Sequence, residues 1–257
     1  MSRSIPNREP GSSPAEILAA GIKAAGGNVS LACSFSMEDV GIIDIAHNAG
    51  LTLGVFALDT GRLHEETYEV AEALVERYRL TIDWYFPRHG DMETLERTKG
   101  LFSFRESLDN RLECCRIRKV EPLSRALQGL NGWVTGMRRE QSVTRSDLQA
   151  IERDELNGGI LSPASGISAV TKIFSAEQPQ KISSTLLKIN PLVDWSERQV
   201  LDYTTEHNLP KNRLYNQGFR SIGCAPCTRA IGPSDQEREG RWWWENPGNK
   251  ECGLHRR

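Results

Sequence analysis

Two pairs of cysteines, far apart in the sequence, are the residues best suited to bind a metal centre. One pair is adjacent, Cys114 and Cys115 in RLECCRIRK, and the other is Cys224 and Cys227 in SIGCAPCTR. Four thiolates satisfy either a tetrahedral zinc ion or an iron–sulfur cluster. Adjacent cysteines chelate one small ion poorly, because neighbouring side chains on a helix diverge by about 100°. The spacing therefore favours a 4Fe–4S cluster over zinc, and nothing in the sequence indicates a secreted disulfide framework.

A further cysteine, Cys252 in KECGLH, is the best candidate for a nucleophile. His255 lies three residues later, and Arg238 and Arg241 would share one face of a helix. Cationic neighbours raise the thiolate fraction at neutral pH, because an unperturbed thiol has a pKa of about 8.5. Arginine also binds oxyanions in a bidentate manner. We expect a thiolate that attacks an electrophile carrying anionic oxygens; the alternative is a solvated basic tail, which three consecutive tryptophans do not favour.

An alternating pattern of strands and helices precedes and surrounds these motifs. Apolar runs predict strands within 28–36, 51–60, 80–87 and 132–137, and periodic patterns predict helices within 15–27, 38–50, 64–78 and 195–208. Strand–helix alternation predicts an α/β fold with a doubly wound, mostly parallel sheet and right-handed crossovers.

Two loops of this predicted sheet have residues suited to a nucleotide. Ligands of such sheets bind beyond the carboxyl ends of the strands. The loop from Ser34 to Asp39 offers hydroxyl groups and free N–H groups at a helix start, which together make an anion site. Asp59-Thr60-Gly61 ends the next strand, and its carboxylate is suited to a ribose or base donor. The alternatives are an N-cap and a turn that need no ligand, and neither loop is a Walker A or G-x-G-x-x-G motif.

Composition limits the classes of function. The 32 Lys and Arg residues nearly balance 34 Asp and Glu residues, which gives no reason to expect nucleic acid as a partner. The polar N-terminus lacks the apolar core of a signal peptide, and no apolar run is long enough to span a bilayer. We expect a cytoplasmic protein without a membrane partner. Its predicted parts are a lead and short helix over 1–27, a nucleotide-binding domain over 28–220 with an insertion near 155–184, and a mobile, lid-like C-terminal segment over 221–257.

Several motifs, in order, resemble the phosphoadenylyl-sulfate (PAPS) reductase family, of adenine-nucleotide α-hydrolase fold. They are SFSMEDVGI, LDTGRLHEETYE, GMRREQSVTR, NPLVDWSERQV, the two cysteine pairs and RWWWENPGNKECGLH. The four paired cysteines resemble those members that reduce adenylyl sulfate (APS), because members that prefer PAPS generally lack them.

The resemblance implies an activity in sulfate assimilation and cysteine biosynthesis. APS and reduced thioredoxin, or glutaredoxin, would give sulfite, AMP and the oxidised reductant, through an S-sulfocysteine on Cys252. It also implies a 4Fe–4S cluster on Cys114, Cys115, Cys224 and Cys227, and a homo-oligomer, often a tetramer. By position, the residues that match the sulfate- and phosphate-binding ones are Lys119, Arg145, Arg238, Arg241 and His255. Arg138 and Arg139 are the substitutes for Arg145 if the shift caused by the insertion begins earlier in the chain. The nucleotide loops contain Ser34, Ser36, Glu38, Asp39, Asp59, Thr60 and Gly61.

Three alternatives remain open from the sequence. The enzyme could use PAPS, or both nucleotides. The chain could instead be a non-catalytic, zinc-stabilised nucleotide-binding module, which leaves Cys252 and the basic tail without a role. A nucleotidyl transferase on the same sheet needs neither a cluster nor a terminal thiol, and the sequence fits it poorly.

Overall fold

A six-stranded sheet forms the centre of the computed structural model, which describes residues 11–142, 145–154 and 186–246. The strand order is β3-β2-β1-β4-β6-β5, and every neighbouring pair is parallel except β5 and β6. The strands are β1 (Val29–Cys33), β2 (Gly54–Leu58), β3 (Asp83–Tyr85), β4 (Gly132–Val134), β5 (Ile151–Arg153) and β6 (Leu187–Ile189). The predicted α/β fold with a mostly parallel, doubly wound sheet is confirmed.

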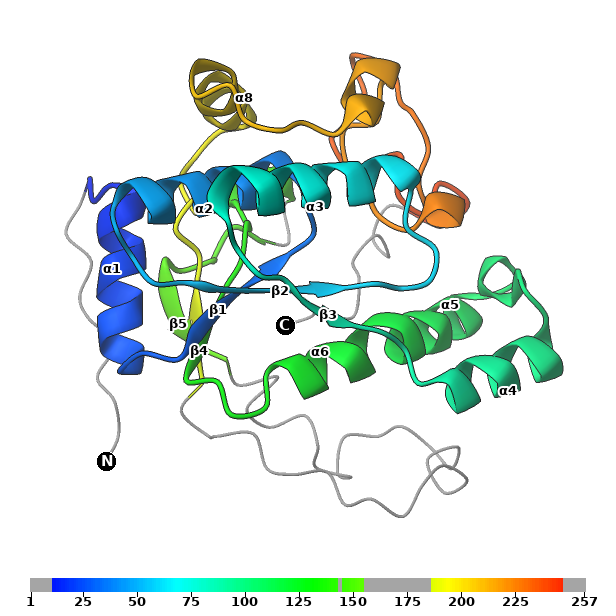
Figure 1. Ribbon diagram of the computed structural model, residues 1–257. Coiled ribbons are helices and arrows are strands. Elements are labelled where there is room, and N and C mark those ends of the chain that lie inside the picture. The colour runs from blue at the N-terminus through cyan, green and yellow to red at the C-terminus, as the bar shows by residue number, and fades with distance from the viewer. Residues whose placement is uncertain (1–10, 143–144, 155–185, 247–257) are drawn as a thin grey trace.

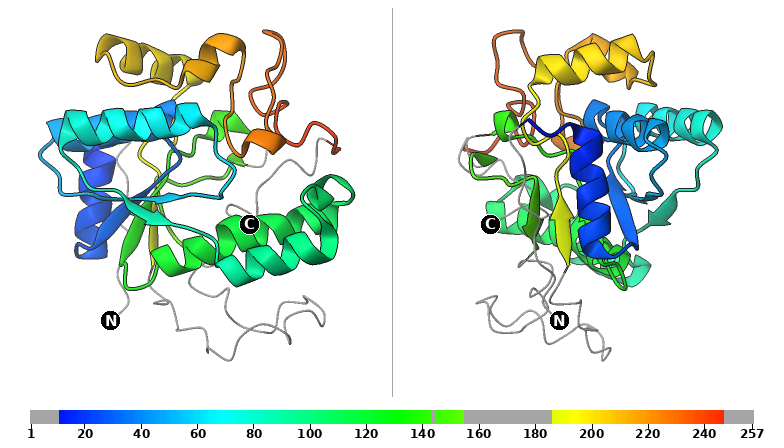
Figure 2. Two further views of the ribbon diagram at one scale, coloured as in Figure 1. Left: turned by 45° about the vertical axis from the view of Figure 1, so that its right-hand side comes forward. Right: turned by 90° about the vertical axis from the view of Figure 1, so that its left-hand side faces the viewer.

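Helices cover both faces of this sheet. They are α1 (Pro14–Ala25), α2 (Met37–Asn48), α3 (Glu65–Tyr78), α4 (His89–Lys99), α5 (Leu108–Cys115), α6 (Glu121–Ala126) and α8 (Glu197–Glu206). Figure 1 shows α2 and α3 on one side of the sheet and the green helices α4 to α6 on the other. In both figures α8 packs over α2 on the side away from the sheet (Figure 2).

Serine caps fix where three helices begin. Ser13 and Glu16 form a capping box at α1, and Ser196 and Gln199 form one at α8. The side chain of Ser36 accepts a hydrogen bond from the backbone N–H of Asp39 at the start of α2. Each cap satisfies an N–H group that has no partner inside its helix. The first helix therefore begins at Pro14, one residue before the range predicted for it.

Several short elements were not predicted. Helices α4, α5 and α6 and strands β5 and β6 lie in stretches with weak apolar periodicity; in α4 only Leu95 is buried. The antiparallel pair β5–β6 brackets the predicted insertion, and the N–H of Asp154 donates to the carbonyl of Leu186 at 2.9 Å. The predicted insertion itself, near 155–184, lies outside the described residues.

The hydrophobic core separates into three clusters. The largest lies between the sheet and α1, α2 and α3, and it includes the buried thiol of Cys33. A second lies between α6 and the strands, around Trp133. The third contains the four paired cysteines with Phe104 and Trp242. No helix among the described parts of the chain is both long and apolar enough to cross a membrane.

A buried carboxylate joins α2, α3 and α8. Asp44 accepts hydrogen bonds from the hydroxyls of Tyr78 and Tyr203, at 2.8 and 2.7 Å. It also accepts one from the amide of Asn48 at 2.9 Å, and Nδ1 of His207 lies 2.9 Å from its carboxylate. Because these donors come from three helices, Asp44 holds the outer helical layer in register.

Replacing Asp44 therefore tests how this layer is held. Asp44→Ala leaves partly buried hydroxyl donors without an acceptor, and we expect a loss of about 3 kcal/mol in the free energy of unfolding. Asp202→Ala removes an exposed pair with Arg198 and is expected to cost about 0.5 kcal/mol or less. Urea denaturation of both variants measures the difference; equal losses would contradict the assignment.

Candidate active site

A cavity of about 220 Å³ opens at the carboxyl ends of β1, β2 and β4. The strand order reverses between β1 and β4, and this is where open α/β sheets bind ligands. The predicted substrate residues that line this large cavity are Ser34, Ser36, Glu38, Asp39, Thr60, Lys119, Arg145, Arg238 and Arg241. The topology thus brings together residues that span more than 200 positions of the sequence.

The loop after β1 satisfies most of its own donors. The N–H and hydroxyl of Ser34 donate to the carboxylate of Asp39 at 2.6 and 2.7 Å. The N–H of Met37 donates to the hydroxyl of Tyr215 at 3.3 Å. Phe35 takes the left-handed conformation, with φ 63°, which turns the chain into α2. The predicted anion site therefore contains an internal carboxylate beside the helix start, rather than a row of free N–H groups.

Burial raises the pKa of Asp39 to about 6, against the lowering effect of the Ser34 hydrogen bonds; the nearby charge of Glu38 raises it further.

Glycine at position 136 allows the end of β4 to lie against Glu38 and Asp39. A Cβ there would lie 2.5 Å from Oδ1 of Asp39 and 2.7 Å from Cβ of Glu38. The end of β4 can therefore approach the first turn of α2 only through a residue without a side chain.

The loop after β2 divides its residues between a turn and the cavity. Asp59 accepts hydrogen bonds from the N–H of Gly61 at 2.7 Å and from the hydroxyl of Tyr68 at 2.9 Å. Asp59 and Gly61 are not among the cavity-lining residues, whereas Thr60 is. Thr60 also accepts a hydrogen bond from the thiol of Cys224 at 3.3 Å. The Asp59 carboxylate thus stabilises the turn that presents Thr60.

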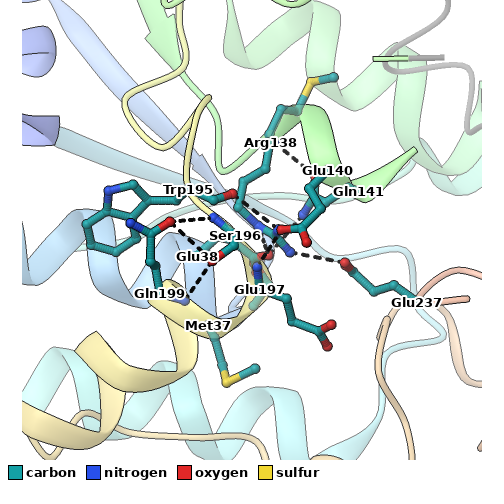
Figure 3. A network of polar contacts seen from close by, with 12 residues as sticks. Met37, Glu38, Arg138, Glu140, Gln141, Trp195, Ser196, Glu197, Gln199 and Glu237 are labelled. Carbon is teal, nitrogen blue, oxygen red and sulfur yellow. Dashed lines mark hydrogen bonds and ion pairs between the residues drawn. The ribbon is translucent and has the colours of Figure 1, made fainter. Parts of the chain in front are cut away.

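Arg138 lies behind the cavity rather than in its lining. Its guanidinium donates to Glu38 at 2.9 Å, Glu237 at 3.0 Å and Glu140 at 3.4 Å, as Figure 3 shows. Arg145 does line the cavity and donates to the side chain of Gln141. Three arginines were offered by the sequence for one role, Arg138, Arg139 and Arg145, and of these only Arg145 lies in the lining of the large cavity.

The four paired cysteines surround a second, smaller cavity. All four are free thiols that are at least 92% buried, and they line this thiol cavity together with Arg111, Arg118 and Trp242. Cys114 and Cys115 end α5, whose chain continues into a π-helical turn over Arg116–Val120. Cys224 immediately precedes a short 3₁₀ turn, Ala225–Cys227, and Cys227 ends it. The fold thus brings together two pairs separated by more than 100 residues.

Burial raises the pKa of the Cys227 thiol to about 12, and it also raises that of Cys114. These thiols are therefore protonated at neutral pH unless a metal displaces their protons. No group of three or more His, Cys, Asp or Glu side chains within the described ranges could hold a single metal ion. The thiols share a cavity without forming the compact shell that one zinc ion takes.

Buried donors face this thiol cavity. Nε of Arg118, Nε of Arg241 and the indole N–H of Trp242 have no hydrogen-bond partner among the described residues. Trp242 has a φ of 42°, an uncommon conformation for a bulky residue, and its ring lies 4.6 Å from the Arg111 guanidinium and 4.7 Å from that of Arg241. Unpaired buried donors are costly, so the geometry fits an acceptor of negative charge in the thiol cavity.

Lys119 and Arg241 line both cavities. The Arg241 guanidinium packs directly on Gly223, where a Cβ would lie 2.4 Å from one of its nitrogens. Two cationic side chains therefore separate the nucleotide-loop cavity from the thiols. Cys252 and His255, the predicted nucleophile and its neighbour, lie outside the described residues.

The chain leading toward Cys252 is tied to the helix that carries Cys114 and Cys115. Arg111 of α5, which is fully buried, donates to Glu245 at 2.6 Å. Arg105 lies within 5.3 to 5.7 Å of four rings, those of Phe102, Phe104, Trp243 and Trp244. These contacts fix the tryptophan run against the wall of the thiol cavity.

Sequence reasoning missed several residues that line the large cavity. They are Gln141, Tyr215, Arg220, Ser221, Ile222, Gly223 and Glu237. The sequence did contain a signal for some of them. FRSIG directly precedes Cys224, so these residues must lie close to the thiols. Glu237 carried no such signal, because an acidic residue in a basic stretch reads as a solvated side chain.

The sheet and its cavity define an α/β protein with a nucleotide-type site at the switch point. In fold the chain is similar to the PAPS reductase of Candida auris in its phosphate complex, with a TM-score of 0.64, 24% identity, and coverage of 86% of this chain and 91% of that one. A family model, the phosphoadenosine phosphosulfate reductase domain, matches residues 28–230. The chain belongs to this family, as the sequence motifs predicted.

Relatives of higher identity have a more specific name. Adenosine 5′-phosphosulfate reductase of Allochromatium vinosum is 44% identical, over 90% of this chain and 79% of that protein. The protein of the same name from Burkholderia cepacia is 41% identical, over 88% and 80%. The chloroplastic 5′-adenylylsulfate reductase 3 of Arabidopsis thaliana is 41% identical over 95% of this chain, which spans about half (49%) of that longer protein.

Gly136→Ala tests the close approach of β4 to α2. The added methyl group must displace Glu38 and Asp39, so we expect a loss of about 1–3 kcal/mol in the free energy of unfolding and weaker AMP binding. Gly90→Ala is the matched control, because a Cβ at that position meets nothing within 4 Å. Denaturation and calorimetric titration with AMP check both variants; an unchanged Gly136→Ala protein would show that the approach is not close.

The pKa of Asp39 predicts a pH dependence of stability. Since burial raises this pKa from 3.8 to about 6, the folded state holds a proton that the unfolded state releases between these values. Stability therefore falls as pH rises through that window. Asp39→Asn cannot titrate, so its urea midpoint should change less than that of the wild type between these pH values; parallel curves would contradict the assignment.

Proposed function

We propose that the chain is an adenylyl-sulfate reductase, which converts APS to sulfite and AMP in sulfate assimilation. The relatives named for this activity support the substrate. The structural observation that carries the proposal is the pair of adjoining cavities, one at the nucleotide loops and one among four thiols, with Lys119 and Arg241 in both linings. The anionic sulfate–phosphate end of APS needs cations where its negative oxygens lie.

In the proposed reaction, the thiolate of Cys252 attacks the sulfur of APS. The sulfur–oxygen bond to the phosphate breaks, AMP leaves with the electron pair, and Cys252 carries an S-sulfo group. Lys119, Arg145, Arg238 and Arg241 offset the charge of the sulfate and of the departing phosphate, and His255 supports the thiolate.

A dithiol of thioredoxin, or of glutaredoxin, then regenerates the enzyme. Its thiolate attacks the Cys252 sulfur and releases sulfite, and its second thiol resolves the mixed disulfide. The two electrons that reduce the sulfur come from this dithiol, which ends as a disulfide. We place this chemistry in the reducing cytoplasm, where the described cysteines would stay free.

We infer that Cys114, Cys115, Cys224 and Cys227 hold a 4Fe–4S cluster. The donors of Arg118, Arg241 and Trp242 that face the thiol cavity suit the sulfur atoms of an anionic cluster. When bound, the cluster would join α5 to the Cys224–Cys227 turn and supply fixed negative charge beside Lys119. Zinc, and with it a purely nucleotide-binding module, is the second candidate, because the adjacent pair Cys114 and Cys115 chelates one small ion poorly.

The sequence resemblance also leads us to propose that the working form is a homo-oligomer, for example a tetramer. The nucleotide choice belongs to the same proposal: the four cysteines favour APS, and use of PAPS or of both nucleotides is the second candidate. These points need no change in the chemistry at Cys252.

The first test is sulfite release from APS and from PAPS, side by side, with reduced thioredoxin and protein purified without oxygen. We expect release from APS only, and none from Cys252→Ser, whose visible absorbance should match that of the wild type. Equal release from both nucleotides would make the enzyme dual-specific. No release from either nucleotide, or turnover by Cys252→Ser, would overturn the function or the nucleophile.

Iron content tests the ligand assignment. Cys227→Ser should lose its iron and visible absorbance, whereas Cys33→Ser should keep both, because Cys33 lies in the core cluster between the helices and the sheet. Metal analysis and absorbance of anaerobically purified proteins provide the measurement. A full iron complement in Cys227→Ser, or zinc in place of iron in the wild type, would contradict the assignment.

A further inference from the structure

Arg138 is the most completely buried charge near the large cavity, yet it does not line that cavity. The residue is 1% exposed. Its guanidinium donates to carboxylates of Glu38, Glu140 and Glu237, and to the carbonyl of Trp195 at 3.5 Å. A buried guanidinium is stable only when its donors are paired, and each of these donors meets an acceptor from another part of the chain.

The ion-pair partners of Arg138 come from three elements, and two of these partners, Glu38 and Glu237, line the large cavity. Glu38 lies in the first turn of α2, beside the loop that follows β1. Glu140 lies in the short turn Arg139–Gln141, which leads to Arg145. Glu237 belongs to residues 232–241, here called the closing segment, which also carries Arg238 and Arg241. Figure 3 shows the side chains of Glu38, Glu140 and Glu237 converging on Arg138.

A second layer of contacts supports the same junction. The amide of Gln141 donates to Glu38 at 2.9 Å, and the N–H of Glu197 donates to Glu140 at 2.8 Å. Glu197 pairs with Arg220, whose guanidinium donates to the carbonyl of Asp235 at 2.6 Å. The start of α8 therefore also contacts the closing segment, at a point two residues before Glu237.

The link between Arg138 and Glu237 has a direct consequence for Arg238. Glu237 is 3.0 Å from Arg138 and adjoins Arg238 in the chain, and both Glu237 and Arg238 line the cavity. At the other end of the closing segment, Arg241 is held by the β-bridge with Thr228 and by the packing of its guanidinium on Gly223. The anchors at Glu237 and at Arg241 thus set the positions of Arg238 and of Arg241 itself.

We propose that Arg138 is a positioning residue, which fixes the closing segment to the walls formed by α2 and the turn at Arg139–Gln141 and thereby aims Arg238 and Arg241 at the sulfate end of the substrate. This assignment replaces the substrate-binding role that the sequence offered for Arg138. It rests on the proposed function for the identity of the substrate, but the mechanical link itself rests only on the contacts above.

Two variants separate this role from a contribution to folding alone. Arg138→Met removes all three ion pairs, whereas Glu237→Gln removes only the charge on the closing segment and leaves Arg138 paired with Glu38 and Glu140. Arg198→Met is the matched control, because Arg198 is an exposed arginine paired with a residue of its own helix.

The first readout is hydrogen–deuterium exchange of the full-length protein, which requires no turnover. We expect faster exchange of amides in residues 232–241 in Arg138→Met and Glu237→Gln, and no change in Arg198→Met. Unchanged exchange of the closing segment in Glu237→Gln, the variant that keeps the other two ion pairs, would overturn the proposal whatever the activity of the enzyme.

The second readout is the comparison of APS with AMP. A positioning role predicts that the KM for APS rises about tenfold in each variant while the dissociation constant of AMP changes by about twofold or less. The double variant should be no worse than Arg138→Met, because both changes break one link. Additive effects, or a fall in kcat with unchanged KM, would overturn the positioning role; absence of sulfite release in the wild type would instead refute the proposed function.

Discussion

Buried positive charge between the two cavities is the constraint on which the rest of the structure depends. Arg118 and Arg241 are buried, and the partly buried Lys119 lies with Arg241 in both cavity walls. Burying a guanidinium is costly unless acceptors surround it. Some acceptors are internal: Arg118 donates to Glu96 at 2.7 Å and to the carbonyl of Thr60 at 2.5 Å. The Nε donors of Arg118 and Arg241 have no such acceptor among the described residues. These two residues line the thiol cavity, where we propose that the cluster binds, and Arg241 also lines the large cavity, where we propose that the anionic substrate binds.

The need of buried charges for partners also explains why carboxylates line the large cavity. Glu38, Asp39 and Glu237 line a cavity for which we propose an anionic ligand. Glu38 and Glu237 face Arg138, and Asp39 faces the donors of Ser34, so each carboxylate is engaged by the protein. Burial, together with the nearby charge of Glu38, raises the pKa of Glu237 to about 7 despite Arg138. These acidic groups thus organise the cationic side chains that line the large cavity.

The thiols depend on this arrangement in turn. Burial disfavours their ionised forms, as the raised pKa values of Cys114 and Cys227 indicate. A metal centre that replaces the thiol protons would bring negative charge to the buried donors around them. On this proposal, the cluster and the cationic side chains of Lys119 and Arg241 stabilise one another. The same two side chains also line the cavity proposed for the substrate. A structural and electrostatic role for the cluster follows without any electron transfer through it.

The sequence by itself determined the fold class, the order of the first strands and helices, the family, and nine of the residues that line the large cavity. Local patterns were sufficient there, because caps, apolar runs and motifs such as SFSMED and DTG are read within a few residues. Tertiary structure alone decided that Asp59 belongs to a turn, that Arg138 lies behind the cavity and Arg145 in its lining, and that Glu237 joins the site. The roles of Arg138 and Glu237 depend on contacts between residues about 100 positions apart, and no local pattern encodes such a distance.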